Sequence, residues 1–98
     1  MATLIKVDGT KTVVTPRNKK TGFTLEEVYE LLGCDCVQCV DVKNGAEKNM
    51  ICDECGKCRI GWRDRVNQEA TRLFDETYGA GRDLIVGDVL MCSNAEWK

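Results

Sequence analysis

Histidine is absent from this 98-residue sequence, and serine occurs only once, as Ser93 near the C-terminal end. Without histidine, neither a Cys–His nor a Ser–His nucleophile pair can form, and mixed Cys/His zinc sites are excluded. The phosphate-binding patterns GxxxxGK[ST] and GxGxxG are also missing. Catalysis would have to rest on carboxylates, lysine, tyrosine or an unassisted cysteine, so we expect a protein without enzymatic activity.

Long apolar runs are missing as well. No run approaches the roughly 20 residues of a membrane span, and the N-terminal stretch lacks the form of a signal peptide. The formal net charge of −2 gives no long-range attraction to phosphate backbones or anionic membranes. We therefore expect a single cytoplasmic domain over residues 1–98, without membrane association and with nucleic acid an unlikely partner.

β-Favouring runs alternate along the chain with two amphipathic patterns. Asp-Gly at 8–9 and Asn-Gly at 44–45 predict turns between paired strands, while Thr24 and Gly33 are typical of a helix start and stop. The expected elements are strands 3–7 and 12–15, helix 25–32, strands 36–42 and 48–54, helix 64–78 and strand 83–93. This order, β-β-α-β-β-α-β, predicts an α+β fold with a mostly antiparallel sheet and two helices. Residues 94–98 are expected to form a loose tail.

Seven cysteines are the most conspicuous feature of the composition. An odd number without an export signal argues against a disulfide framework. Two CxxC pairs fifteen residues apart match the spacing of a four-thiolate zinc site, and an iron–sulfur cluster is a weaker alternative. The predicted zinc ligands are Cys36, Cys39, Cys55 and Cys58, with Cys34, Cys52 and Cys92 as alternates.

The same cysteines have a second interpretation as small core residues of a β-hairpin. If the strands pair about Asn44-Gly45, Cys36 lies opposite Cys55, and Cys39 lies opposite Cys52. Because side chains alternate faces along a strand, Cys36 and Cys39 then point to opposite sides, and no face holds four thiolates. Buried cysteine packs as a small hydrophobe. Both interpretations remain open from the sequence.

An aromatic residue between basic residues precedes the second helix. Trp62 lies among Arg59, Arg63 and Arg65, a pattern that can stack on a base but more often packs an aromatic ring against the helix. Asn67, near the start of that helix, is expected to hydrogen-bond to a neighbouring turn. The arginine-flanked tryptophan therefore makes a weak nucleotide or nucleic-acid binder a third possibility.

Three segments between residues 22 and 93 follow a recognisable pattern: first FTLEEVYELLGCDCVQCVDV, second CDECGKCRIGWRDRVNQEATRLF and third DLIVGDVLMC. Together they resemble the domain of unknown function 3846, a family of small phage and mobile-element proteins. The matching positions in the last two are Asp53, Glu54, Gly56, Lys57, Asn67, Ala70, Thr71, Ile85, Gly87 and Asp88. Members of the family carry apolar or acidic residues at the positions of the central cysteines, so the resemblance implies that metal binding would be an acquired feature.

The resemblance brings no known activity, so no catalytic residue is carried over. It implies an origin in a bacteriophage, prophage or plasmid, with expression in a bacterial cytoplasm. Our leading hypothesis is a small non-enzymatic accessory protein that binds a host protein or a small ligand and needs no cofactor. The alternatives are the Zn²⁺-stabilised four-cysteine module and the weak nucleotide or nucleic-acid binder.

Overall fold

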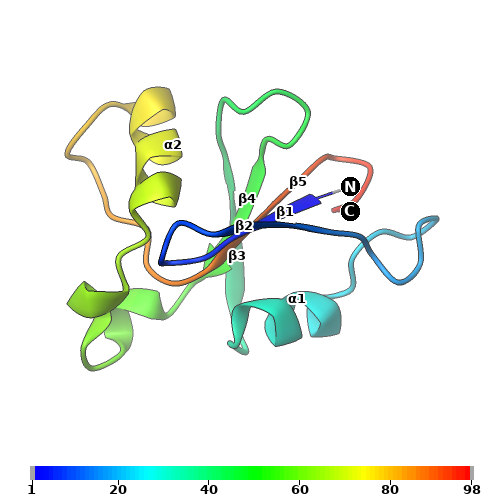
Figure 1. Ribbon diagram of the computed structural model, residues 1–98, viewed down its shortest axis with the longest axis horizontal. Helices are drawn as coiled ribbons and strands as arrows, with labels where there is room; N and C mark the ends of the chain where they lie inside the picture. The colour runs from blue at the N-terminus through cyan, green and yellow to red at the C-terminus, as the bar shows by residue number, and fades with distance from the viewer. Residues whose placement is uncertain (1, 98) are drawn as a thin grey trace.

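The computed structural model describes residues 2–97 of the chain. A five-stranded sheet in the order β2-β1-β5-β4-β3, with every neighbouring pair antiparallel, forms its centre (Figure 1). The strands are β1 (Ala2–Ile5), β2 (Lys11–Val14), β3 (Val37–Asp41), β4 (Asn49–Asp53) and β5 (Val89–Cys92). The last strand in the sequence is thus the middle strand of the sheet. The predicted α+β class and order of elements are confirmed.

The first helix, α1 (Leu25–Leu32), has the predicted bounds. The backbone N–H of Glu27 donates to Thr24 Oγ1, and the backbone N–H of Thr24 donates to Glu27 Oε1, each at 3.2 Å. This reciprocal capping box satisfies N–H groups that a helix start leaves unpaired. Gly33 ends the helix with φ of +66°, a left-handed conformation that favours glycine. The start and the end of α1 are therefore set by capping residues that directly flank it in the sequence.

The second helix, α2 (Gln68–Tyr78), begins four residues later than predicted. Asn67 caps it with an extended backbone (φ −90°, ψ 100°), and Val66 forms an isolated antiparallel bridge with Val86. The residues ahead of that bridge form two 3₁₀ turns, η1 (Gly56–Cys58) and η2 (Trp62–Arg65). The prediction of helix over residues 64–67 is therefore wrong, because pairing with a distant segment outweighs helical spacing.

The final strand is also shorter than predicted, since β5 covers four residues of the expected 83–93. Gly87, with φ of +86°, turns the chain just before the strand. Residues 83–88 instead form a loop that contacts the start of α2, where the backbone N–H of Asn67 donates to the carbonyl of Ile85 at 2.8 Å. Gly87, which the sequence marked as a bend, thus separates the Val66–Val86 bridge from β5, which begins at Val89.

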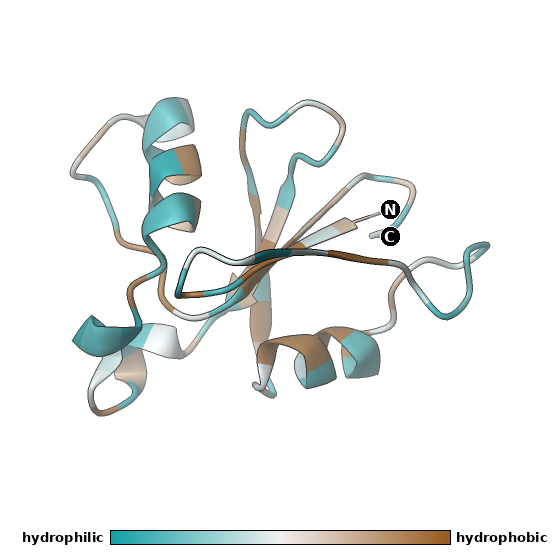
Figure 2. Ribbon diagram, in the orientation of Figure 1, coloured by the Kyte–Doolittle hydropathy of each residue, from teal (hydrophilic) through white to brown (hydrophobic). Residues whose placement is uncertain are grey.

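One helix covers each face of the sheet, because strand side chains alternate between two hydrophobic clusters. The cluster beneath α2 contains Ile5, Met50, Cys52, Ala70, Leu73, Val89 and Met91. The cluster beneath α1 contains Leu4, Val28, Leu32, Ile51, Leu90 and Cys92. Figure 2 shows hydrophobic residues along the central strands, whereas most residues of α2 are coloured as hydrophilic. The sheet is therefore the middle layer of three.

The register of the β3–β4 hairpin differs by one residue from the prediction. Cys39 pairs with Ile51, and Cys52 pairs with Gln38. Because directly paired residues share a face, Cys39 and Cys52 lie on opposite faces of the sheet. The predicted pairing of these two cysteines is wrong, and the one-residue shift places Cys52 in the cluster beneath α2.

The residues after β5 pack onto the fold instead of forming a loose tail. The backbone N–H of Phe23 donates to the carbonyl of Glu96 at 2.8 Å, and Trp97 packs against the cluster beneath α1. An aromatic side chain removes a large apolar area from water, which offsets the entropy lost by ordering these residues. The tail prediction is wrong for residues 94–97, and Lys98 lies outside the described residues. Within residues 2–97, no helix has the length and apolar character needed to cross a membrane.

Candidate functional site

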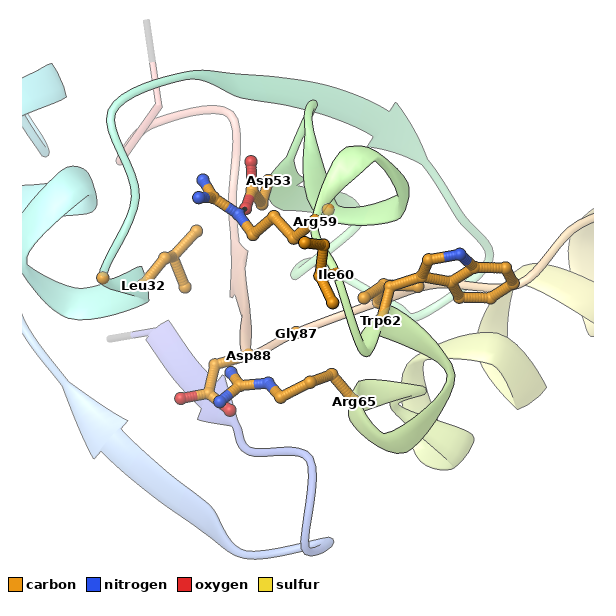
Figure 3. A pocket seen from close by; sticks show the side chains of 11 residues that line it. Leu32, Asp53, Arg59, Ile60, Trp62, Arg65, Gly87 and Asp88 are labelled. Carbon is orange, nitrogen blue, oxygen red and sulfur yellow. Dashed lines mark hydrogen bonds and ion pairs between the residues drawn. The ribbon is translucent and has the colours of Figure 1, made fainter.

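A pocket of about 240 Å³ lies at the end of the sheet where four segments meet (Figure 3). The four segments are the C-terminal end of α1, the end of β4, residues 56–65 and the loop at 86–88. Residues 56–65, which include both 3₁₀ turns, are called the arginine segment below. Leu32 and Ile60 lie on facing sides of the pocket, while Arg65 extends toward Asp88 across its lower edge. The pocket is thus built from parts of the chain that are distant in sequence.

The arginine segment is anchored at both ends. The carboxylate of Asp53 accepts from the backbone N–H of Cys55 and from Nε of Arg59, each at 2.9 Å. At the other end, the backbone N–H of Gly87 donates to the carbonyl of Arg65 at 2.8 Å. Gly56 is buried against Val86, whose Cβ would lie 3.2 Å from a Cβ added at the glycine. These contacts hold the segment against the sheet and leave its middle exposed.

The middle of this segment presents apolar and cationic groups to solvent. Ile60 has a fractional exposure of 107%, the highest among the exposed large hydrophobic side chains of residues 2–97. Trp62 is half-buried, and the guanidinium carbon of Arg63 lies 4.8 Å from the centroid of its ring. Trp62 is among the residues that line the pocket, and in Figure 3 its indole ring points away from Leu32. The structure thus places Trp62 at a surface.

The guanidinium groups of the segment differ in how they are paired. A hydrogen bond from Arg59 to Asp53 raises the pKa of Arg59 above its usual value. Within residues 2–97, the structure gives the guanidinium of Arg65 no ion pair. The facing carboxylate of Asp88 accepts from the backbone N–H of Val7 at 3.0 Å. Arg65 and the carboxylate of Asp88 therefore face one another at the edge of the pocket.

Asn67 connects the pocket wall to the centre of the fold, and its side chain is fully buried. Its Nδ2 donates to the carbonyls of Ile5 and Gly87, both at 3.0 Å, and its Oδ1 accepts from the backbone N–H of Ala70 at 3.1 Å. One amide thereby joins β1, the 86–88 loop and the first turn of α2. The structural role expected for Asn67 is observed, but its partners are β1 and the 86–88 loop and not the turn at residues 53–57.

The cysteines are spread over several environments. Cys52 and Cys92 are buried in opposite clusters, and burial raises their pKa values to about 11 and about 12. Exposed Cys39 has Sγ 3.7 Å from Oδ1 of Asn49. Cys34 is half-buried beside the cluster beneath α1. A core role is thus clear for two of the seven cysteines.

The four predicted zinc ligands are divided between the ends of the hairpin and its middle. Cys36 precedes β3, Cys55 is half-buried ahead of η1, and Cys58 is exposed at the end of η1. Cys39 lies in the middle of β3, on the face covered by α1. Among the described residues, the structure contains no group of three or more cysteine, aspartate or glutamate side chains placed to hold a metal ion. Zinc binding stays untested as a prediction from spacing, whereas the placement of Cys39 within the paired strand favours the interpretation without metal.

Because these four cysteines lie apart, we expect the stability of the protein not to depend on a bound metal ion. A structural four-thiolate zinc site contributes about 10–16 kcal/mol of apparent binding free energy, so its loss would unfold a domain of this size. We expect the melting temperature to be unchanged by a strong chelator, and the purified protein to contain well under one zinc per chain. Elemental analysis and thermal melts with and without chelator check both points. One zinc per chain with a chelator-induced collapse of the melting temperature would contradict the sheet geometry.

Cys36 is the cysteine most influenced by a neighbouring charge. Its Sγ donates to Oε2 of Glu54 at 3.1 Å, and this hydrogen bond to a carboxylate, with burial and the nearby Cys55, raises the pKa of Cys36 to about 12. A thiolate beside the ionised carboxylate is disfavoured by like charge. At pH 8 the Cys36 sulfur is therefore held in its weakly nucleophilic thiol form.

Substituting Glu54→Gln is expected to speed alkylation of Cys36 by about three- to fourfold for each unit by which its pKa falls, because the larger thiolate fraction is partly offset by a lower intrinsic nucleophilicity. Iodoacetamide labelling at pH 8, followed by peptide mass spectrometry, measures the rate at each cysteine. The exposed Cys58 serves as an internal reference, and Glu26→Gln on the exposed face of α1 is the matched control. An unchanged rate at Cys36 would show that the carboxylate does not control this thiol.

The pocket was only partly indicated by the sequence. The sequence pattern singled out Trp62, Arg59 and Arg65, which line one wall of the pocket. Nothing near Leu32 or Asp88 in the sequence indicates that these residues line the same pocket. A model of the family described as Domain of unknown function (DUF3846) matches residues 2–98. No curated protein and no solved structure matches the chain. Because the match extends over nearly the whole sequence, the chain belongs to the DUF3846 family.

Proposed function

We propose that this protein is a small non-enzymatic accessory protein of a phage or mobile element, acting in the bacterial cytoplasm by binding a host protein. The proposed contact surface is the arginine segment together with the pocket beside it. The mobile-element origin rests on the family resemblance of the sequence. The binding role rests on the exposed Ile60 and on the pocket that adjoins it.

The observation that carries the proposal is the full exposure of Ile60 on a segment anchored at both ends. A single exposed apolar side chain is common on protein surfaces. Here the isoleucine adjoins Trp62 and a pocket, on backbone that is already ordered, so little conformational entropy remains to be lost on binding. Burying such a side chain contributes about 1.5–3 kcal/mol. These features are typical of the centre of a protein–protein interface.

The size of the pocket favours a protein over a free metabolite. Sites for drug-sized ligands and cofactors commonly measure roughly 300–1,000 Å³, whereas this pocket measures about 240 Å³ and is partly open. That space suits one apolar side chain of a partner. The pocket carboxylates are also engaged, Asp53 with Arg59 and Asp88 with the backbone of Val7, which supports a role in structure over acid–base chemistry.

Affinity capture from a bacterial lysate, with matched variants, tests this proposal. We expect a protein that is retained by the wild type and lost with Ile60→Asp. Leu25→Asp is the control, because Leu25 is 51% exposed in the first turn of α1, where a carboxylate suits the helix dipole. Equal retention by all three proteins, or a small molecule released from the wild type and not from Ile60→Asp, would overturn the proposal.

A further inference from the structure

We propose that the free edge of β2 pairs with the same edge of a second copy of this chain, so that two five-stranded sheets join antiparallel across a two-fold axis. β2 and β3 are the outer strands of the sheet (Figure 1). None of the residues of β2 lines the pocket beside the arginine segment. Such pairing is therefore separate from the proposed contact surface and does not depend on it.

The backbone of β2 presents a row of hydrogen-bonding groups that the sheet does not use. At the turn between β1 and β2, the backbone N–H of Lys6 donates to the carbonyl of Thr10 at 2.9 Å. Because bonded pairs alternate along antiparallel strands, every second residue of β2 from Thr10 onward bonds to β1. The residues between them, Lys11, Val13 and Thr15, turn their backbone groups outward. Among residues 2–97, these outward groups have no hydrogen-bond partner.

The opposite edge of the sheet, formed by β3, is partly closed by α2. Tyr78 Oη donates to the carbonyl of Asp41 at 2.6 Å, and the backbone N–H of Lys43 donates to Thr77 Oγ1 at 2.8 Å. Both backbone groups face outward, because the N–H of Val42 between them donates across the hairpin. Natural proteins commonly cover strand edges in this way to prevent pairing. The β2 edge has no such cover.

The sequence of the β2 edge is complementary to itself. When two copies run antiparallel about Val13, this residue faces Val13 of the second copy, Thr12 faces Val14, and Lys11 faces Thr15. Four of these five side chains are β-branched and uncharged, and such cross-strand pairs stabilise a sheet. No like charges face one another. Since both copies use the same surface, the assembly closes at two.

The side chains beside Val13 leave this edge accessible. Val13 itself is 64% exposed in the middle of the edge. A lysine on an edge strand commonly prevents pairing with another chain. Here the ammonium of Lys11 is instead drawn over the sheet to Glu69 of α2, at 2.7 Å. The edge therefore combines an exposed apolar residue with unpaired backbone groups and a lysine that is already engaged.

A groove beside the edge can receive side chains of the second copy. It measures about 430 Å³ and lies between β2 and α1, with Val14, Phe23 and Leu31 among its lining residues. Its arginine is already engaged, because Arg17 pairs with Glu30 at 2.8 Å. In a continuous sheet, side chains that face α1 in one copy lie beside those that face α1 in the other. The second copy thus brings threonine and valine side chains to an apolar groove.

Sedimentation equilibrium of the full-length protein in reducing buffer tests this pairing. We expect a monomer at about 10 µM and half-association at about 0.1–1 mM, because one short strand is a small contact beside the roughly 1,200–2,000 Å² of a stable interface. Val13→Asp should weaken association about tenfold or more, since two carboxylates would face each other at the axis. Val13→Pro, which removes an outward N–H and no bond to β1, should do the same. The matched control is Leu84→Asp, because Leu84 is 43% exposed and lies near Gln38 of β3, at the other edge.

Amide hydrogen exchange, followed by NMR, locates the contact. The Val13 amide should exchange about two- to threefold more slowly at about 1 mM than at about 50 µM, in proportion to the share of dimer. The Thr12 amide, bonded to β1, should be protected at both concentrations. A monomer throughout this range would overturn the inference, and so would a dimer without this slowing at Val13.

Two further outcomes separate this pairing from the proposed function. Ile60→Asp should associate like the wild type, and loss of its association would place the contact at the arginine segment and overturn pairing through β2. A protein captured from lysate that is lost with Val13→Asp and retained by Ile60→Asp would overturn the second copy in favour of a strand from another protein. A failed dimer leaves the capture experiment with Ile60→Asp as it stands.

Discussion

Asn67→Ala is expected to lower the free energy of unfolding by about 3–5 kcal/mol, a large share of the stability of a small domain. The side chain is fully buried and makes three hydrogen bonds to backbone groups. Alanine would leave the buried carbonyl of Ile5 and the half-buried carbonyl of Gly87 without this donor. It would also remove the cap of α2. Buried groups left unpaired cost more than a hydrogen bond contributes when formed.

Urea unfolding followed by circular dichroism measures this effect. The matched control is Asn44→Ala, because Asn44 makes one side-chain hydrogen bond, to the carbonyl of Glu47 at 3.1 Å in the β3–β4 turn. We expect the control to cost about 1 kcal/mol or less. A similar loss in both variants would mean that Asn67 does not join the three elements as the structure describes. Loss of the Asn67 contacts should also loosen the 86–88 loop and thus weaken binding at the pocket.

Features set by neighbouring residues could be predicted from the sequence. Helix α1 was predicted with its observed bounds, because Thr24 and Gly33 act within a few residues of the backbone that they cap. The Asp-Gly and Asn-Gly turns likewise specify the two hairpins. Here the local preference and the final structure agree, so no information from the rest of the chain is needed.

Features that depend on distant pairing could not be predicted. Val66 fits the helical spacing of α2 but instead pairs with Val86, and Gly87 delays β5 until residue 89. The β3–β4 register shifted by one residue, since the burial of Met50 and Cys52 against α2 decides which residues face that helix. The pocket could not be predicted for the same reason, because its walls come from distant segments that meet only when the sheet has formed.

Gly22→Ala is expected to cost about 3 kcal/mol or more, because no side chain fits at this position. Gly22 has φ of +80°, and a Cβ there would lie 2.3 Å from the carbonyl oxygen of Glu96. That oxygen belongs to the backbone that accepts from Phe23 N–H, so it cannot move without breaking the contact. The substitution should release residues 94–97 from the fold and expose Trp97, which packs against the cluster beneath α1.

Gly9→Ala separates the clash from the backbone strain. Gly9 has φ of +91°, and a Cβ added there would meet nothing within 4 Å. Its substitution should therefore cost only the conformational penalty, about 1–2 kcal/mol. Urea unfolding gives both values, and faster proteolysis near the C-terminal end, in Gly22→Ala alone, reports the release of the segment. An equal decrease in the free energy of unfolding in the two variants would indicate that residues 94–97 do not pack against Gly22. Packing of Trp97 would then be the contact that holds these residues on the fold.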